Sequence, residues 1–148
     1  MGDIMSENMQ VPESMNTDDA IKNQTKLFGL IAEHASPNRL FVMLNNKIKK
    51  ENIDAMMIPM NIREDDFYFT LSNMKKSHVN GAYIAQEYQE IAVELLDEAD
   101  EFVQVYSRCD FVIREGEKLL GTYLGKNGVL EGEALAQEIF TTYIKERK

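Results

Sequence analysis

Residues 81–90 constrain the fold most, because this stretch changes from the pattern of a strand to that of a helix. Tyr83, Ile84 and Ala85 suit a pleated surface that is covered on its faces. From Glu87 onward, the apolar residues recur at helical spacing. In an open parallel sheet, a strand-to-helix junction lies at the carboxyl end of the strands, where such folds bind ligands. The sequence therefore predicts an α/β fold whose pocket is lined from this junction.

The rest of the chain alternates strands with helices and ends in a hairpin and a last helix. Strands are predicted at residues 26–31, 53–60, 102–106, 109–114 and 118–123, and helices begin near residues 36, 61, 87 and 131. Gly29, inside the first strand, predicts the close approach of a neighbouring backbone. This order favours a three-layer α/β/α sandwich, with a mainly parallel sheet of about six strands, an antiparallel hairpin and a C-terminal helix.

Length and charge limit the number of domains and the kinds of partner. The 148 residues suit one domain, which we place at residues 24–148, after a polar stretch at residues 1–23 that we expect to be a flexible tail. The net charge of −9 argues against nucleic acid as a partner. No apolar run approaches the ~18 residues of a membrane span. With an acidic amino terminus that is unlike a signal peptide, these features favour a cytoplasmic protein.

Metal-ligating patterns are weak throughout the sequence. Cys109 is the single cysteine, which excludes an internal disulfide and a cysteine-built metal site. The acidic run at residues 94–101 lacks the fixed spacing of a calcium-binding loop, and a solvated helix end explains it. We therefore expect no metal site.

Four segments, in order, resemble the substrate-binding domain of shikimate dehydrogenases. Residues 26–31 followed by His34-Ala35-Ser36-Pro37 resemble that family's first strand, its Ser-x-Ser-Pro turn and its first helix. Residues 81–90 fall where the family has Gly-x-Asn-Val-Thr-x-Pro-x-Lys-Glu, and residues 99–107 where it has Ala-x-x-Ile-Gly-Ala-Val-Asn-Thr. Residues 119–125 fall where it has Leu-x-Gly-Tyr-Asn-Thr-Asp. The resemblance covers roughly residues 25–127 and implies the fold of that domain.

The same resemblance implies that the reactive groups of the family are replaced in this chain. Gln89 stands at the position of the proton-transferring lysine, and Gly125 at that of its aspartate partner. Because an amide has no useful pKa near neutrality and glycine has no side chain, neither transfers a proton. No Gly-x-Gly-x-x-Gly follows a strand, so we expect no cofactor in this chain, and NADP only if a separate domain supplies it. We assign no catalytic residue.

The candidate ligand-binding residues follow from the same positions: His34, Ser36, Tyr83, Gln89, Tyr106 and Tyr123. Each also has a structural explanation. His34 suits a turn, and Ser36 suits the N-cap of the first helix. The three tyrosines, which stand where the family has asparagines, also suit a core that aromatic rings complete.

Three functions remain open. The first is an inactive shikimate dehydrogenase-like domain, a pseudoenzyme, that binds a protein partner or a small hydroxy acid or aromatic-pathway metabolite. The second is an NADP-dependent shikimate dehydrogenase component that works with a separate cofactor-binding chain, with His34 or Glu87 taking over proton transfer. The third is a structural or assembly subunit. Its last helix would bury its apolar side on its own sheet or on another subunit, as in a homodimer.

Overall fold

The computed structural model describes residues 25–35, 39–127 and 132–145, so the predicted tail at residues 1–23 lies outside the described residues. The strands are β1 (Lys26–Ala32), β2 (Ala55–Asn61), β3 (Val79–Ile84), β4 (Glu98–Ala99), β5 (Phe111–Glu115) and β6 (Lys118–Thr122). The α-helices are α1 (Arg39–Lys50), α2 (Glu64–Asn73), α3 (Gln89–Ala92), α4 (Glu101–Tyr106) and α5 (Gly132–Ile139). Short 3-10 helices are η2 (Met74–Lys76), η3 (Gln86–Tyr88), η4 (Val93–Leu95) and η5 (Leu124–Asn127), and the π-helical turn η6 (Phe140–Lys145) extends α5.

The six strands form one sheet in the order β2-β1-β3-β5-β6-β4. β1 pairs in parallel with both β2 and β3, and β4 pairs in parallel with β6. β5 pairs antiparallel with β3 on one side and with β6 on the other. Five strands therefore point the same way and β5 alone runs against them, which confirms the mainly parallel sheet with an antiparallel piece.

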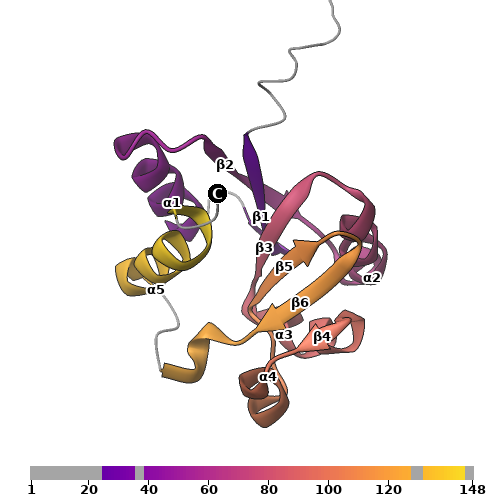
Figure 1. Ribbon diagram of the computed structural model, residues 1–148. Helices are drawn as coiled ribbons and strands as arrows, with labels where there is room; N and C mark the ends of the chain where they lie inside the picture. The colour runs from indigo at the N-terminus through magenta and orange to yellow at the C-terminus, as the bar shows by residue number, and fades with distance from the viewer. Residues whose placement is uncertain (1–24, 36–38, 128–131, 146–148) are drawn as a thin grey trace, which may run out of the picture.

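Both faces of the sheet are buried, and alternate residues of each central strand pack into the core on one face or the other. In β1, Phe28 and Leu30 belong to the core under α1 and α5, whereas Ile31 belongs to the core under α2. In β5, Phe111 and Val112 divide in the same way. Figure 1 shows α1 and α5 together on one side of the sheet and α2 on the other side. The predicted three-layer architecture is confirmed, and it explains why these strands read as nearly continuous apolar runs.

The last helix packs on its own domain. Leu135, Ile139 and Phe140 are buried in the core that α1 covers, and the ring of Tyr143 stacks on that of Phe111 at 4.2 Å. Of the two burial sites expected for this helix, the structure shows the intramolecular one. Whether the chain forms a homodimer stays a prediction.

The prediction of a strand at residues 102–106 is wrong, because this segment forms the helix α4. The Asp100 carboxylate accepts hydrogen bonds from the backbone N–H groups of Phe102 and Val103, both at 3.0 Å, and so caps the helix. Ser107 ends the helix in the left-handed region, with φ of 57°. The strand propensity of Phe, Val and Tyr is weaker than this local capping, since strand propensity depends on packing partners.

Two strand glycines make room for different neighbours. A Cβ on Gly81 would lie 2.8 Å from the backbone carbonyl oxygen of Val112, in the adjacent strand β5. A Cβ on Gly29 would lie 2.8 Å from Sδ of Met60. The close neighbour of Gly29 is therefore the flexible end of a side chain, and the expected backbone approach there is wrong.

Candidate functional site

A cavity of about 280 Å³ lies at the carboxyl ends of β3 and β6. These two strands flank β5 and point the same way, so their ends meet at one edge of the sheet with the segment that leads into β5 between them. The residues that line the cavity are Tyr83, Gln86, Gln89, Arg108 and Tyr123. Three of them come from the strand-to-helix junction, which is where the sequence predicts a pocket.

The Gln89 side chain is fixed at both ends of its amide. It is only 5% exposed. Its Nε2 donates to the Ile84 carbonyl oxygen at 3.0 Å, and its Oε1 accepts from Nε of Arg108 at 3.1 Å. The amide therefore connects the end of β3 to the guanidinium group.

Arg108 brings a permanent positive charge to the cavity. Besides its bond to Gln89, its Nη2 donates to the Gln86 carbonyl oxygen at 3.3 Å, and its Nη1 pairs with Oε2 of Glu90 at 3.1 Å. The Arg108 side chain is 25% exposed, whereas that of Glu90 is 74% exposed. The guanidinium is therefore held from the protein side by two neutral acceptors and from the solvent side by one exposed carboxylate.

Asp110 does not line the cavity but holds together the chain segments that form its wall. It is 2% exposed, and its carboxylate accepts hydrogen bonds from the backbone N–H groups of Leu124 at 2.7 Å and Gly125 at 3.0 Å. Its own N–H donates to the Thr122 carbonyl oxygen, and its carbonyl oxygen accepts from Ile84 N–H. One residue therefore connects the ends of both strands that carry the cavity.

Tyr83 stays a neutral phenol in this setting. Burial raises the pKa of the Tyr83 hydroxyl well above its ordinary range, and the negative charge of Asp110 raises this pKa further. The hydroxyl group is therefore available as a hydrogen-bond donor at neutral pH, and it does not act as a base.

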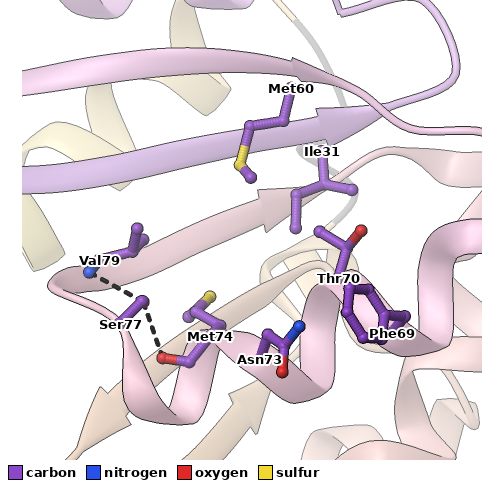
Figure 2. Close-up of a pocket in the computed structure, with 8 residues that line it drawn as sticks. All are labelled: Ile31, Met60, Phe69, Thr70, Asn73, Met74, Ser77 and Val79. Atoms are coloured by element: carbon purple, nitrogen blue, oxygen red, sulfur yellow. Dashed lines mark hydrogen bonds between the residues drawn. The ribbon is translucent and has the colours of Figure 1, made fainter.

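A second cavity of about 280 Å³ lies between α2 and the sheet (Figure 2). Ile31 and Met60 on the strands face Thr70 and Met74 on the helical side. The complete lining is Ile31, Met60, Phe69, Thr70, Asn73, Met74, Ser77 and Val79, none of which carries a charge. The Ser77 hydroxyl already donates to the Met74 carbonyl oxygen and accepts from Val79 N–H. This second cavity offers apolar contact and few polar groups.

Comparisons with known proteins show which proteins the chain resembles. The chain is 26% identical over 101 residues to the NADP(+) shikimate dehydrogenase of Pyrococcus furiosus, a match that covers 68% of this chain and 37% of that protein. It is 26% identical over 111 residues to the corresponding enzyme of Dictyoglomus turgidum, which covers 75% of this chain and 40% of that protein. No protein-family model matches the sequence.

Solved structures share the fold. A shikimate dehydrogenase solved with NADP+ superposes with a TM-score of 0.67 over 88% of this chain and 43% of that chain, at 18% identity. The enzyme from Aquifex aeolicus gives 0.66 over 81% of this chain and 43% of that chain, also at 18% identity. A 5-ketofructose reductase from a Gluconobacter strain gives 0.66 over 71% of this chain and 38% of that chain, at 16% identity.

The chain is similar in sequence to part of two shikimate dehydrogenases and shares the fold of a third. It spans 37% and 40% of the lengths of the two curated shikimate dehydrogenases. The resemblance to the substrate-binding domain of that family is thus supported by sequence and by fold.

The structure brings three of the six candidate residues together around the first cavity: Tyr83, Gln89 and Tyr123. Tyr106 lies beside it, with its ring centre 5.2 Å from that of Tyr123. His34 is exposed in the turn after β1 and lines neither cavity, and Ser36 lies outside the described residues. That any of these residues binds a ligand stays a prediction.

Arg108 and Asp110 are not among the residues that the sequence predicts for the site. Each stands between two segments of the shikimate dehydrogenase resemblance, which ends at residue 107 and resumes at residue 119. The available signal was local: a basic and an acidic residue flank Cys109, directly before a strongly apolar strand in a chain of net charge −9.

The acidic run has structural roles. Asp97 accepts a hydrogen bond from Leu119 N–H at 2.8 Å and pairs with Lys75, and Asp100 caps α4. In the part of the chain that the structure describes, no group of three or more His, Cys, Asp or Glu residues is arranged to hold a metal ion. Nor does that part contain a helix long and apolar enough to cross a membrane.

Proposed function

We propose that this chain is a shikimate dehydrogenase-like binding domain that holds a small metabolite at the ends of β3 and β6 without oxidising or reducing it. The observation that carries the proposal is that the Gln89 side chain is fixed by hydrogen bonds. Both ends of its amide are hydrogen-bonded within the protein, at the position where the resemblance implies a proton-transferring lysine. This side chain supports the cavity and has no proton to exchange near neutral pH.

The remaining lining groups favour binding over proton transfer. They are one further amide, two phenols and one guanidinium. Arginine remains protonated in proteins, and burial keeps the Tyr83 hydroxyl protonated. These groups donate hydrogen bonds and offer ring faces, which suits a small ligand that carries hydroxyl groups.

A thermal-shift panel tests this function. The probes are shikimate, quinate, 3,4-dihydroxybenzoate and other small hydroxy acids, each titrated to millimolar concentration. A ligand that binds the folded state alone stabilises it by RT ln(1 + [L]/Kd), which is about 2.7 kcal/mol at one hundred times Kd. We expect a saturable rise in Tm for at least one probe and no change in nicotinamide absorbance with shikimate and NADP. A flat panel would contradict binding, and turnover that Gln89→Ala abolishes would contradict the absence of catalysis.

A second candidate is an oxidoreductase component that works with a separate cofactor-binding chain. It is favoured by the match to two NADP(+) shikimate dehydrogenases of which this chain spans 37% and 40%. His34 or Glu87 would have to take over proton transfer, although neither lines the cavity and the Glu87 carboxylate already accepts a hydrogen bond from Glu33 N–H at 2.8 Å. Mixing the chain with candidate dinucleotide-binding chains, with shikimate and NADP present, distinguishes this function by the appearance of NADPH absorbance.

A further inference from the structure

The charge in the first cavity selects the kind of ligand. Arg108 is the charged residue among the five that line the cavity, and it stands in a chain of net charge −9. A cation within a partly enclosed site attracts an anion more strongly than one in open solvent, because the surrounding dielectric constant is lower. The cavity volume of about 280 Å³ is just below the usual range for ligand sites, which is ~300–1,000 Å³. The anion is therefore small.

Hydrogen bonds fix the orientation of the guanidinium before any anion binds. Gln89 and the Gln86 carbonyl oxygen accept from Nε and Nη2, and Gln89 is itself anchored on Ile84. Neither acceptor carries a charge, so neither neutralises Arg108. A planar guanidinium that is fixed in orientation suits the two oxygens of a carboxylate, which it binds in a forked arrangement.

Glu90 pairs with the solvent side of the guanidinium, and another carboxylate could replace it there. Its oxygen meets Nη1 at 3.1 Å, and its side chain is 74% exposed. Exposed ion pairs of this kind contribute little to stability because water and salt screen them. A carboxylate on a ligand inside the cavity would be less hydrated than Glu90, and it would displace Glu90 at small cost.

The other lining groups suit the rest of such a ligand. Tyr83 and Tyr123 present phenol rings and hydroxyl groups, and Gln86 presents an amide. An aromatic or cyclic body that carries hydroxyl groups would contact the rings and hydrogen-bond to these polar atoms.

We propose that Arg108 binds the carboxylate of a small hydroxylated cyclic or aromatic acid. When no such acid is bound, Glu90 forms the ion pair with the guanidinium. This inference rests on the proposed binding function and adds the residue that anchors the ligand and the carboxylate that competes with it.

The test compares each acid with a neutral analogue on three forms of the full chain. The probes are 3,4-dihydroxybenzoate against 3,4-dihydroxybenzamide, and shikimate against its methyl ester, measured by calorimetric titration. On the unaltered chain, we expect the acid to bind at least about tenfold more tightly, since a hydrogen bond to a charged group is worth about this factor. Arg108→Gln should reduce acid affinity at least about tenfold and leave the affinity for the neutral analogue within about twofold.

Glu90→Gln separates this proposal from a merely structural ion pair. Removing the competing carboxylate should strengthen acid binding about threefold or more, with no gain for the amide or the ester, and this gain should shrink at high salt. Because Glu90 is exposed, this variant should fold, so the proposal stays testable even if Arg108→Gln does not. A structural pair predicts a lower Tm and no gain in acid affinity.

The outcomes distinguish the two proposals. Equal binding of acids and neutral analogues, on the unaltered chain and on Arg108→Gln, would overturn the role of Arg108 and leave the binding function standing. An unchanged acid affinity in Glu90→Gln would overturn the role of Glu90. No binding of either kind of probe would overturn the binding function and this inference together.

Discussion

Nε of Arg108 donates a hydrogen bond to Oε1 of Gln89 across 3.1 Å, so the side chain at position 89 acts as an acceptor for a cationic group. In the shikimate dehydrogenase resemblance, this position belongs to a lysine. A lysine ammonium here would face the guanidinium at the same short distance. The amide and the arginine therefore form a matched pair, and changing either one alone should be unfavourable.

Gln89→Lys should destabilise the fold by about 2–4 kcal/mol and should not create dehydrogenase activity. A buried cation would lose hydration and would repel Arg108. Chemical denaturation of the variant against Gln89→Met, which has a similar length and no charge, measures the effect. The double variant Gln89→Lys with Arg108→Gln should recover part of the loss. A single variant as stable as the unaltered chain would contradict the described geometry.

Asp110→Asn should cost about 1–3 kcal/mol of stability. The buried carboxylate accepts from Leu124 and Gly125, and an amide would turn an NH₂ group toward one of these two donors. Urea denaturation measures the change, and faster amide exchange at residues 124 and 125 locates it. Asp54→Asn is the control, because Asp54 accepts an exposed hydrogen bond from Thr25 at a strand end. Equal effects at the two sites would contradict a special role for Asp110.

Gly81→Ala should destabilise the chain by about 1–3 kcal/mol, the usual cost of inserting atoms into a packed core. The new methyl group would meet the Val112 carbonyl oxygen, which is part of the backbone of β5 and has little freedom to move. Gly29→Ala is the matched variant in β1. Its methyl group would meet Sδ of Met60, which can rotate away, so a smaller loss is expected. Differential scanning calorimetry of both variants tests this order, and a reversed order would contradict it.

Stability should fall as pH rises above about 9, partly through Cys109. Burial, and then the charge of Asp110, raises the pKa of the Cys109 thiol to about 12. The thiol of the unfolded chain has a pKa of about 8.5, so it loses its proton first, and ionisation then favours unfolding. The contribution is fully present below the unfolded pKa and is lost as pH rises from about 8.5 toward 12. Melting curves from pH 7 to 11 should show a shallower decline for Cys109→Ala than for the unaltered chain. Parallel declines would contradict this assignment.

The sequence predicted most of the sheet and its helices because strands that are buried on both faces have nearly continuous apolar runs. β1 and the β5–β6 hairpin appear where apolar runs are bounded by turn residues, and the last helix buries the side that its period indicates. Residues 102–106 were misassigned because a cap at Asp100, outside the segment, decides its conformation. Arg108 was missed because its role depends on contact with Gln89, 19 residues earlier in the chain, which the residue pattern does not record.

The reversed direction of β5 has a practical consequence for engineering. Its first residues adjoin the cavity, whereas its last residues lead into the exposed turn at Gly116 and Glu117, at the far edge of the sheet. A fluorescent label or an inserted peptide at that turn would sit a full strand length from the cavity. The hairpin thus supplies an attachment point for a reporter that leaves the lining of the cavity undisturbed.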